Sequence, residues 1–396
     1  QEYPANHYLL IILGHGEIIG NETFLQDDFV DEEHFMSLKK LGEILESFSK
    51  EAPGKLEMVG FHSCSMSSVE VAFQLAGNAK YMLASQGPAY VGSWPYRNLL
   101  VRLFKDLKES QKYDAAAIKK LIRKMFSYCF FNNQDFQLAG YSFDISLVDL
   151  DKVEKTKDDI KNLAEQLTSA LRSYPDITKD LIRLAHLDAQ SFSNENYTDL
   201  YDFCWCLEDV CHKSAHSQHE AVVKIREACE KTRTALRIYL KPEVEDKTLV
   251  VASAFAGPAF QYSHGLSVLF PWKEPIGPKR WNDEYSASKF HKDTKWGDFL
   301  QTYFDTTMRE TRATEFGQRA PQKDSNSDDT LSGRILGLLD DLAAKGPFFG
   351  QLAKPGPDHP MGKWGPDDPS GISCNCSTIK NYPRSTLSYP RSTLEE

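Results

Sequence analysis

A histidine and a cysteine each follow an apolar run near the start of the sequence. His15 stands between two glycines directly after residues 8–13, YLLIIL, and Cys64 follows residues 56–61, LEMVGF, by three positions. The thiolate of cysteine is a strong nucleophile, and an imidazole beside it can donate or accept a proton during acyl transfer. The two residue types together could therefore cleave an acyl bond through a covalent thioester.

The backbone around these residues could complete such a site. The N–H groups of Gly16 and Cys64 could bind the oxyanion of a tetrahedral intermediate, and a glycine lets a substrate backbone approach closely. Ser67 and Glu70 match a capping box, so we expect a helix over residues 69–76, just after Cys64. The partial positive charge of that helix N-terminus would favour the thiolate.

The elements that must position these residues follow from the apolar pattern. The two apolar runs are expected to be buried strands, with a third short strand at 81–84. Apolar side chains at helical spacing predict an amphipathic helix over residues 33–50. This order of strands and helices predicts an α/β domain with a mostly parallel sheet. Because parallel strands end at the same edge of a sheet, His15 and Cys64 should face one crevice.

The rest of the chain predicts a helical insertion and a tail. Further periodic segments predict helices near 118–125, 160–171, 222–239 and 296–308, and strands at 248–252 and 266–270. We expect one domain over residues 1–312, with a helical insertion at about 104–239. Residues 313–396 include Gly- and Pro-rich stretches and two copies of YPRSTL. This tail is predicted to be mostly disordered, with a short helix at 335–344.

Composition excludes some classes of partner. The 56 Asp and Glu residues outnumber the 46 Lys and Arg residues, which argues against nucleic acid as the main partner. No apolar run reaches the length of a bilayer span. The eight cysteines are scattered and no secretory signal is visible, so a reducing, cytoplasmic compartment is slightly favoured. Secretion stays open if a signal precedes the sequence given.

Two further features of the sequence, one residue and one acidic segment, each allow two interpretations. His62 lies two residues before Cys64 and could replace His15 as the base, although lining a pocket is favoured. The acidic residues 26–33, QDDFVDEE, could bind calcium, because hard cations prefer several oxygen ligands. A solvated loop is favoured there, and no cofactor is expected.

A cluster of cysteines later in the chain suggests zinc at first sight. Its members are Cys204, Cys206, Cys211 and His212. Their spacing matches no common zinc site, and the segment is rich in apolar residues. Buried helix cysteines are therefore favoured, and no metal site is predicted.

Several segments resemble the clostripain family of cysteine peptidases, in the same order along the chain. They are 6–16 (NHYLLIILGHG), 59–72 (VGFHSCSMSSVEVA), 83–96 (LASQGPAYVGSWPY), 199–203 (DLYDF), 264–271 (HGLSVLFP) and 292–303 (KDTKWGDFLQTY). The similarity covers residues 6–312 and implies a caspase-like three-layer α/β sandwich that hydrolyses protein or peptide substrates. It also implies that His15 and Cys64 form the catalytic dyad, with oxyanion donors at Gly16 and Cys64.

The resemblance also implies where substrate binds. The positions concerned are His62, Ser85, Gln86, Gly92 and Trp94. The family usually has Asp at the position of His62 and often at that of Gly92. Those carboxylates account for its preference for Arg or Lys before the scissile bond. Neither is present here, so we expect a different primary specificity.

The family has a further segment before its His-bearing strand, so we expect a preceding segment or a companion chain to complete the fold. Two other functions stay open. One is a catalytically silent caspase-like scaffold that binds a partner, and the other is a different thiol acyltransferase with the same dyad. The presence of both His15 and Cys64 argues against the first.

Overall fold

The computed structural model describes residues 5–317, except 20–21, 28–33, 52–54, 111–112, 132–139, 194, 239–247 and 276–280. Residues 318–396, with the predicted tail helix at 335–344, lie outside the described residues, as does most of the acidic segment 26–33. Within the described part, no helix is both long enough and apolar enough to cross a membrane.

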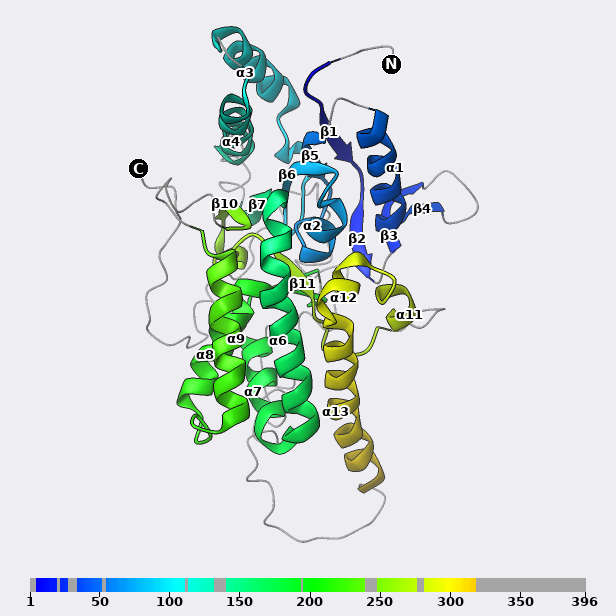
Figure 1. Cartoon of the computed structure of the whole chain (residues 1–396), viewed down its shortest axis with the longest axis vertical. Helices are drawn as coiled ribbons and strands as arrows, with labels where there is room; N and C mark the ends of the chain where they lie inside the picture. Colours follow the sequence, from blue (N-terminus) through cyan, green and yellow to red (C-terminus); the bar gives the residue numbers. More distant parts are fainter. Residues whose placement is uncertain are drawn as a thin grey trace.

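A five-stranded sheet forms the centre of the molecule (Figure 1). In spatial order its strands are β1 (Leu9–Leu13), β5 (Leu56–His62), β6 (Ala79–Ala84), β7 (Phe143–Asp149) and β10 (Val250–Ala256). β1, β5 and β6 pair in parallel, whereas β7 is antiparallel to both β6 and β10. Four of the five strands therefore run in one direction, which confirms the mostly parallel sheet predicted from the sequence.

The register between β1 and β5 fixes where the two strands end. Leu13 pairs with His62, and the N–H of Gly14 donates to the carbonyl of His62 at 3.3 Å. His15 lies two residues after Leu13, and Cys64 lies two residues after His62. Parallel pairing thus brings both residues to the same edge of the sheet, as the sequence predicted.

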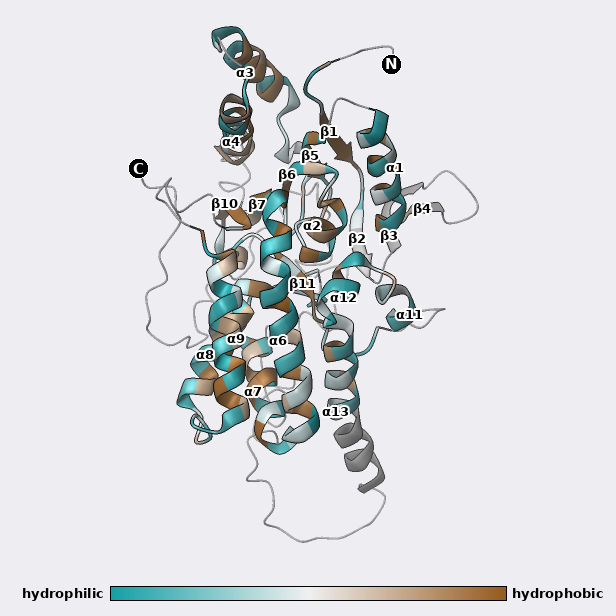
Figure 2. Cartoon of the chain, in the orientation of Figure 1, coloured by the Kyte–Doolittle hydropathy of each residue, from teal (hydrophilic) through white to brown (hydrophobic). Residues whose placement is uncertain are grey.

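Helices cover both faces of the sheet and make three layers (Figures 1 and 2). One face carries α1 (Leu38–Glu51), α2 (Val69–Leu75) and α6 (Val153–Ser173), and the other carries α3 (Tyr96–Glu109) and α4 (Ala115–Phe131). Side chains of a strand alternate between faces. In β5, Val59 and Phe61 pack on the first face and Met58 on the second.

A bundle of helices extends from the first face. Its further members are α7 (Pro175–Asp188), α8 (Leu200–Lys213), α9 (Glu220–Leu236) and α13 (Trp296–Gly317), and α11 (Trp281–Tyr285) and α12 (Lys289–Thr294) join α13 to the body. Two small antiparallel sheets are β11 (Ser267–Leu269), β9 (Tyr197–Asp199) and β8 (Ser191–Phe192), and β2 (Gly16–Ile19), β3 (Glu22–Asp27) and β4 (His34–Met36). Short 3-10 turns lie at Val91–Ser93, Leu150–Lys152 and Pro258–Phe260.

The structure differs from the sequence-based predictions in three places. The interval 104–239 is not a single helical insertion, because β7 interrupts it and lies inside the central sheet. The strand predicted at 266–270 forms as β11 but pairs with β9, outside that sheet. The helix predicted from residue 33 begins at Leu38, because residues 34–36 pair with β3.

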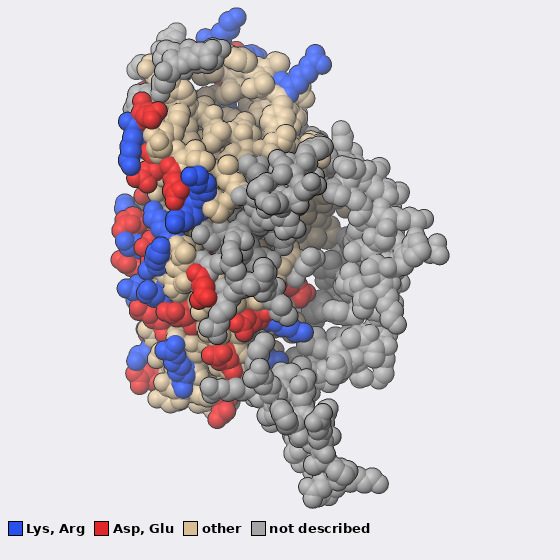
Figure 3. Space-filling model, turned by 90° about the vertical axis from the view of Figure 1, so that its right-hand side faces the viewer, with Lys and Arg blue, Asp and Glu red and all other residues tan. Residues whose placement is uncertain are grey.

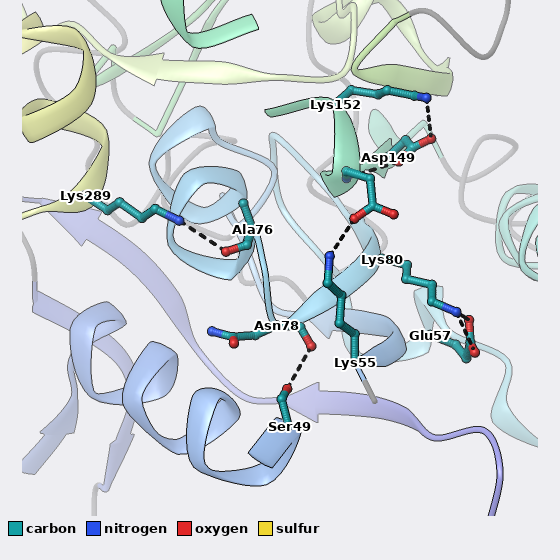
Figure 4. A network of polar contacts seen from close by, with 10 residues as sticks. Ser49, Lys55, Glu57, Ala76, Asn78, Lys80, Asp149, Lys152 and Lys289 are labelled. Atoms are coloured by element: carbon teal, nitrogen blue, oxygen red, sulfur yellow. Dashed lines mark hydrogen bonds and ion pairs between the residues drawn. The ribbon is translucent and has the colours of Figure 1, made fainter. Parts of the chain in front are cut away.

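Charged side chains of both signs are interspersed on the face drawn in Figure 3. A second group of charges lies at the edge of the sheet opposite Cys64 (Figure 4). There Glu57, at the start of β5, pairs with Lys80 at 3.0 Å and with His7 at 2.8 Å. These contacts hold the amino ends of the neighbouring strands β5 and β6 together.

An aromatic cluster joins the end of β11 to the helical bundle. Phe270 is fully buried, and its ring stacks on His186 at 3.9 Å and meets Phe203 and Tyr303 edge-on at 5.1 Å. Burial lowers the pKa of His186 to about 3, so this imidazole is neutral and packs as an aromatic ring.

Replacing the ring at the centre of this cluster should destabilise the fold. We expect Phe270→Ala to lower the free energy of unfolding by about 3–5 kcal/mol, because the surrounding rings cannot collapse into the cavity. Phe104→Ala, at a site 64% exposed, should change it by less than about 0.5 kcal/mol. Urea denaturation followed by circular dichroism measures both, and equal effects would contradict this packing.

Candidate active site

The loops that follow β1 and β5 are in contact. A Cβ atom added to Gly16 would lie 2.3 Å from the carbonyl oxygen of Cys64 and 3.0 Å from the Cβ of Ser63. The backbone at Gly16 therefore lies directly against the backbone of Cys64, and only glycine fits there. The side chain of His15 is exposed and Cys64 is partly exposed, so both are accessible from solvent.

Cys64 is held by backbone groups from a third loop. The N–H of Ala89 donates to Sγ of Cys64 at 3.4 Å, and the N–H of Ser65 donates to the carbonyl of Gly87 at 3.0 Å. Ser65 has a φ of 57°, in the left-handed region that few non-glycine residues adopt. Its hydroxyl contacts that of Ser193, which comes from the loop between β8 and β9.

The helix predicted at 69–76 forms as α2, but Ser67 and Glu70 do not make the expected capping box. The helix starts at Val69, and its N-cap is Ser68, whose Oγ accepts from the N–H of Val71 at 3.3 Å. The start of α2 therefore matches the predicted helix, whereas its N-cap is Ser68 and not Ser67. The N–H of Ala89 is the polar group that the structure places at the sulfur.

The side chains of Ser67 and Glu70, which the predicted capping box would have used, instead bond to residues far away in the sequence. Ser67 Oγ lies 2.7 Å from the carbonyl of Gly265. Glu70 accepts from the N–H of Leu269 at 3.0 Å and from the hydroxyl of Tyr285 at 2.7 Å. Burial raises the pKa of Glu70, and these two donors oppose the shift. Both residues therefore connect α2 to the later part of the chain.

His62 lies on the second face of the sheet, beside the rings of Trp94 and Tyr96. Its Nε2 lies 2.7 Å from the carbonyl of Tyr90, which can only accept, so Nε2 carries the proton. Its Nδ1 accepts from the hydroxyl of Tyr96 at 2.9 Å, and its ring stacks on Trp94 at 5.6 Å. Burial lowers the pKa of His62. With both nitrogens engaged, His62 is badly placed to serve as the base for Cys64.

The other positions implied for substrate binding lie on the loop after β6. Gly92 is exposed in the 3-10 turn, while Trp94 is 3% exposed beneath it. Ser85 is buried, and its carbonyl accepts from the N–H of Ser67 at 2.9 Å. His62, Gly92 and Trp94 thus lie near one another, whereas Ser85 lies deeper, under the Cys64 loop.

Gln86 is fully buried, and its side chain is used inside the protein. Its Nε2 donates to Asp199 at 2.9 Å and its Oε1 accepts from the N–H of Gly265 at 2.8 Å. Its backbone N–H donates to Asp144 at 2.7 Å. In this structure Gln86 holds the loop in place instead of presenting its amide to a substrate.

Asp144 and Asp199 are two buried carboxylates that the sequence reasoning did not single out. They lie 3% and 0% exposed beneath the loop after β6. Burial raises the pKa of each, to about 7 for Asp144. The signal that could have identified Asp144 is its charge inside the otherwise apolar strand segment FDISLV.

The cysteine cluster is structural. Cys204, Cys206 and Cys211 are buried on α8, as predicted, and His212 is exposed. Burial raises the pKa of Cys211 to about 12, so its thiol stays protonated. The six cysteines of the described ranges are all free, and no group of three or more His, Cys, Asp or Glu side chains there could hold a metal.

A family model described as the clostripain family matches residues 1–303. The chain belongs to the clostripain family. It is therefore a cysteine peptidase, and the caspase-like sandwich expected from the resemblance is confirmed. Membership of this family also makes peptides its class of substrate.

Solved structures of C11 cysteine proteases are similar to this chain. A secreted enzyme from Bacteroides thetaiotaomicron, bound to an irreversible peptide inhibitor, is 16% identical, with a TM-score of 0.46 and 74% of each chain covered. An inactive zymogen from Parabacteroides distasonis is 19% identical, with a TM-score of 0.43 and 74% of this chain and 71% of that chain covered. A B. fragilis cysteine protease is 16% identical, with a TM-score of 0.38, and 70% of this chain and 99% of that chain are covered. No curated protein matches the sequence.

Widening the contact between the two loops should impair this clostripain-family site. We expect Gly16→Ala to lower kcat/KM for a peptide substrate by about a hundredfold, because a shift of about 1 Å in a reacting group has an effect of that size. Gly77→Ala is a control with open space around it and a φ of 97°. It should cost about 1 kcal/mol of stability and leave kcat/KM unchanged. Similar losses of kcat/KM in both variants would show that Gly16 has no local role.

Proposed function

We propose that this clostripain-family chain is an endopeptidase that uses Cys64 as nucleophile and His15 as proton donor and acceptor. The observation that supports it best is the contact of Gly16 with the backbone of Cys64. That contact, together with the register of β1 on β5, brings an imidazole and a thiol to one accessible edge of the sheet. The required pair of groups is then available to one substrate.

The proposed reaction begins with attack of the Cys64 thiolate on the scissile carbonyl. A carbon–sulfur bond forms, and the carbonyl electrons move to oxygen, where the N–H groups of Gly16 and Cys64 can donate to the anion. His15 gives a proton to the departing amine as the carbon–nitrogen bond breaks, which leaves a thioester on Cys64. His15 then takes a proton from water, and the water oxygen displaces the sulfur. The N–H of Ala89 can donate to the thiolate before the attack and again after the water oxygen has displaced the sulfur.

We also propose that a specificity pocket lies beside Cys64 and His62 and that it does not select Arg or Lys. His62 stands where relatives usually have Asp, and burial lowers its pKa, so at neutral pH it carries no charge. Its polar contacts are with Tyr90 and Tyr96, and its ring stacks on Trp94. An aromatic, uncharged wall removes the electrostatic reason for binding a cation and favours uncharged side chains.

Substitution of the dyad tests the mechanism. Cys64→Ala should abolish hydrolysis, and His15→Ala should lower kcat by about a hundredfold or more, because each removes a chemical step. Cys206→Ala, on α8, and His216→Ala, at an exposed site, are the matched controls and should keep full activity. Hydrolysis by Cys64→Ala at the wild-type rate would refute the nucleophile, and a silent scaffold would show no hydrolysis in any of the proteins.

A positional peptide library tests the pocket. We expect cleavage after uncharged residues to dominate at pH 7, and His62→Asp to raise the share of Arg and Lys before the scissile bond by about tenfold or more. Val91→Asp, at a 74% exposed position of the 3-10 turn that also holds Gly92, is a control for added charge alone. Dominant cleavage after Arg or Lys by the wild-type protein would refute the altered pocket and leave the peptidase assignment intact.

A further inference from the structure

A buried carboxylate at the start of β7 supports the loop that touches Cys64. The pairing of Ala84 with Ser146 places Asp144 opposite Gln86, two residues beyond the last paired residue of β6. Oδ2 of Asp144 accepts from the N–H of Gln86 at 2.7 Å, and Oδ1 accepts from the N–H of Gly87 at 2.8 Å. One side chain therefore binds two successive backbone N–H groups.

The loop at residues 86–89, which Asp144 binds, also contacts Ser65 and Cys64. The carbonyl of Gly87 accepts from the N–H of Ser65, and the N–H of Ala89 donates to Sγ of Cys64. A Cβ on Gly87 would lie 2.8 Å from the ring of Phe260 and 3.0 Å from Oδ1 of Asp144, so the loop is closely packed where Asp144 holds it. Asp144 is thus linked to Cys64 and Ser65 through the four hydrogen bonds that Gln86, Gly87 and Ala89 make.

We propose that Asp144 is a positioning residue, whose ionised carboxylate holds residues 86–89 against Cys64 and whose protonation releases them. This inference rests on the proposed role of Cys64 in peptide hydrolysis. It makes the reactivity of Cys64 depend on a group that touches neither the substrate nor the reacting atoms.

The chemistry of the carboxyl group explains the dependence. Two oxygens of a carboxylate can accept from two N–H groups, whereas a neutral carboxylic acid offers one good acceptor and one O–H donor. Protonated Asp144 would therefore oppose one of the two N–H groups of Gln86 and Gly87. Burial raises its pKa to about 7, the two N–H donors lower it, and the charge of Asp199 raises it. The group thus titrates in the range where a peptidase works.

The surroundings of Asp144 contain few other charges. The loop at 85–87 and the turn at Pro258–Phe260 contribute polar or apolar side chains, and the start of α8 contributes Asp199. Asp199 is itself bound by the N–H of His264 at 2.7 Å, and the His264 ring lies 3.7 Å from its other oxygen. Burial raises the pKa of Asp199, and His264 lowers it.

Protonation of Asp144 at acidic pH should not unfold the protein. The pKa of Asp144 in the folded chain lies above its ordinary value of 3.8, so the folded state binds the proton more tightly. Its contribution to stability therefore decreases as pH rises from about 4 to about 7 and is more favourable at the acidic end. Loss of Cys64 reactivity below about pH 7 would then reflect the loop and not the fold.

The test compares wild type with Asp144→Asn in the full chain. We would measure the rate at which iodoacetamide alkylates Cys64, with the site identified by peptide mapping, and kcat/KM in parallel, between about pH 5.5 and 8.5. The amide mimics the protonated acid, so the ratio of wild-type to variant rate should rise from near one at about pH 5.5 to about tenfold or more at pH 8.

Asp149→Asn is the matched control. Asp149 ends the same strand at the opposite edge of the sheet, where it lies 4.0 Å from Lys152 (Figure 4). It is also buried, and burial raises its pKa too. This variant should follow the wild type at every pH.

A ratio for Asp144→Asn that is constant with pH, or equal to that of the control, would overturn the proposal. Failure of the proposed function would give a different result. Hydrolysis by Cys64→Ala would refute Cys64 as nucleophile, whereas the alkylation ratio at Cys64 would still test the role of Asp144.

If Asp144→Asn does not fold, amide hydrogen exchange of the wild-type protein tests the proposal instead. Protection of the amides of Gln86, Gly87 and Ala89, corrected for intrinsic rates, should fall between about pH 8 and 6. Constant protection would overturn the proposal.

Discussion

The parallel pairing of β1 with β5 is the constraint on which the candidate site depends. It fixes Leu13 opposite His62, so the loops carrying His15 and Cys64 leave the sheet side by side. A slip of one residue would turn every side chain of β1 to the other face. The close contact of Gly16 with the Cys64 backbone then sets the distance between the loops, which no larger residue would allow.

A buried polar network supports the loop that contacts Cys64. Gln86, Asp144 and Asp199 tie together the loop after β6, the start of β7 and the start of α8. Ser67 and Gly265 extend the network to the turn before β11. Buried polar groups with satisfied partners hold one geometry, because each lost partner leaves an expensive unpaired group. The clostripain-family site is therefore supported by parts of the chain about 200 residues apart.

The sequence predicted those parts of the fold that depend on local pattern. The apolar runs before His15 and Cys64 form the expected strands, and the helix predicted at 160–171 lies within α6. The helix predicted at 222–239 forms as α9, which ends at Leu236. β7 was missed because FDISLVD carries two aspartates, which usually exclude a central strand. The structure tolerates both, since Asp144 binds two N–H groups and Asp149 lies near Lys152 at the sheet edge.

The sequence predicted the place of Cys64 at the edge of the sheet better than it predicted the contacts of the neighbouring side chains. Ser67 and Glu70 have the spacing of a capping box, but their tertiary partners Gly265 and Tyr285 lie far away in sequence, and no local pattern could show them. For His62, spacing alone left the choice between base and pocket residue open. Its two hydrogen bonds, to Tyr90 and Tyr96, depend on how the later loop folds back on β5.

The central claim is that Cys64 is the activated thiol of this protein. The most direct measurement is competitive alkylation of the native chain with a substoichiometric thiol reagent, followed by peptide mapping of all eight cysteines. We expect Cys64 to react first, and His15→Ala to slow that reaction by about tenfold or more, while Cys129, Cys211 and Cys229 stay unlabelled because burial raises their pKa. Labelling of Cys64 no faster than in the unfolded chain, or unaffected by His15→Ala, would contradict the claim.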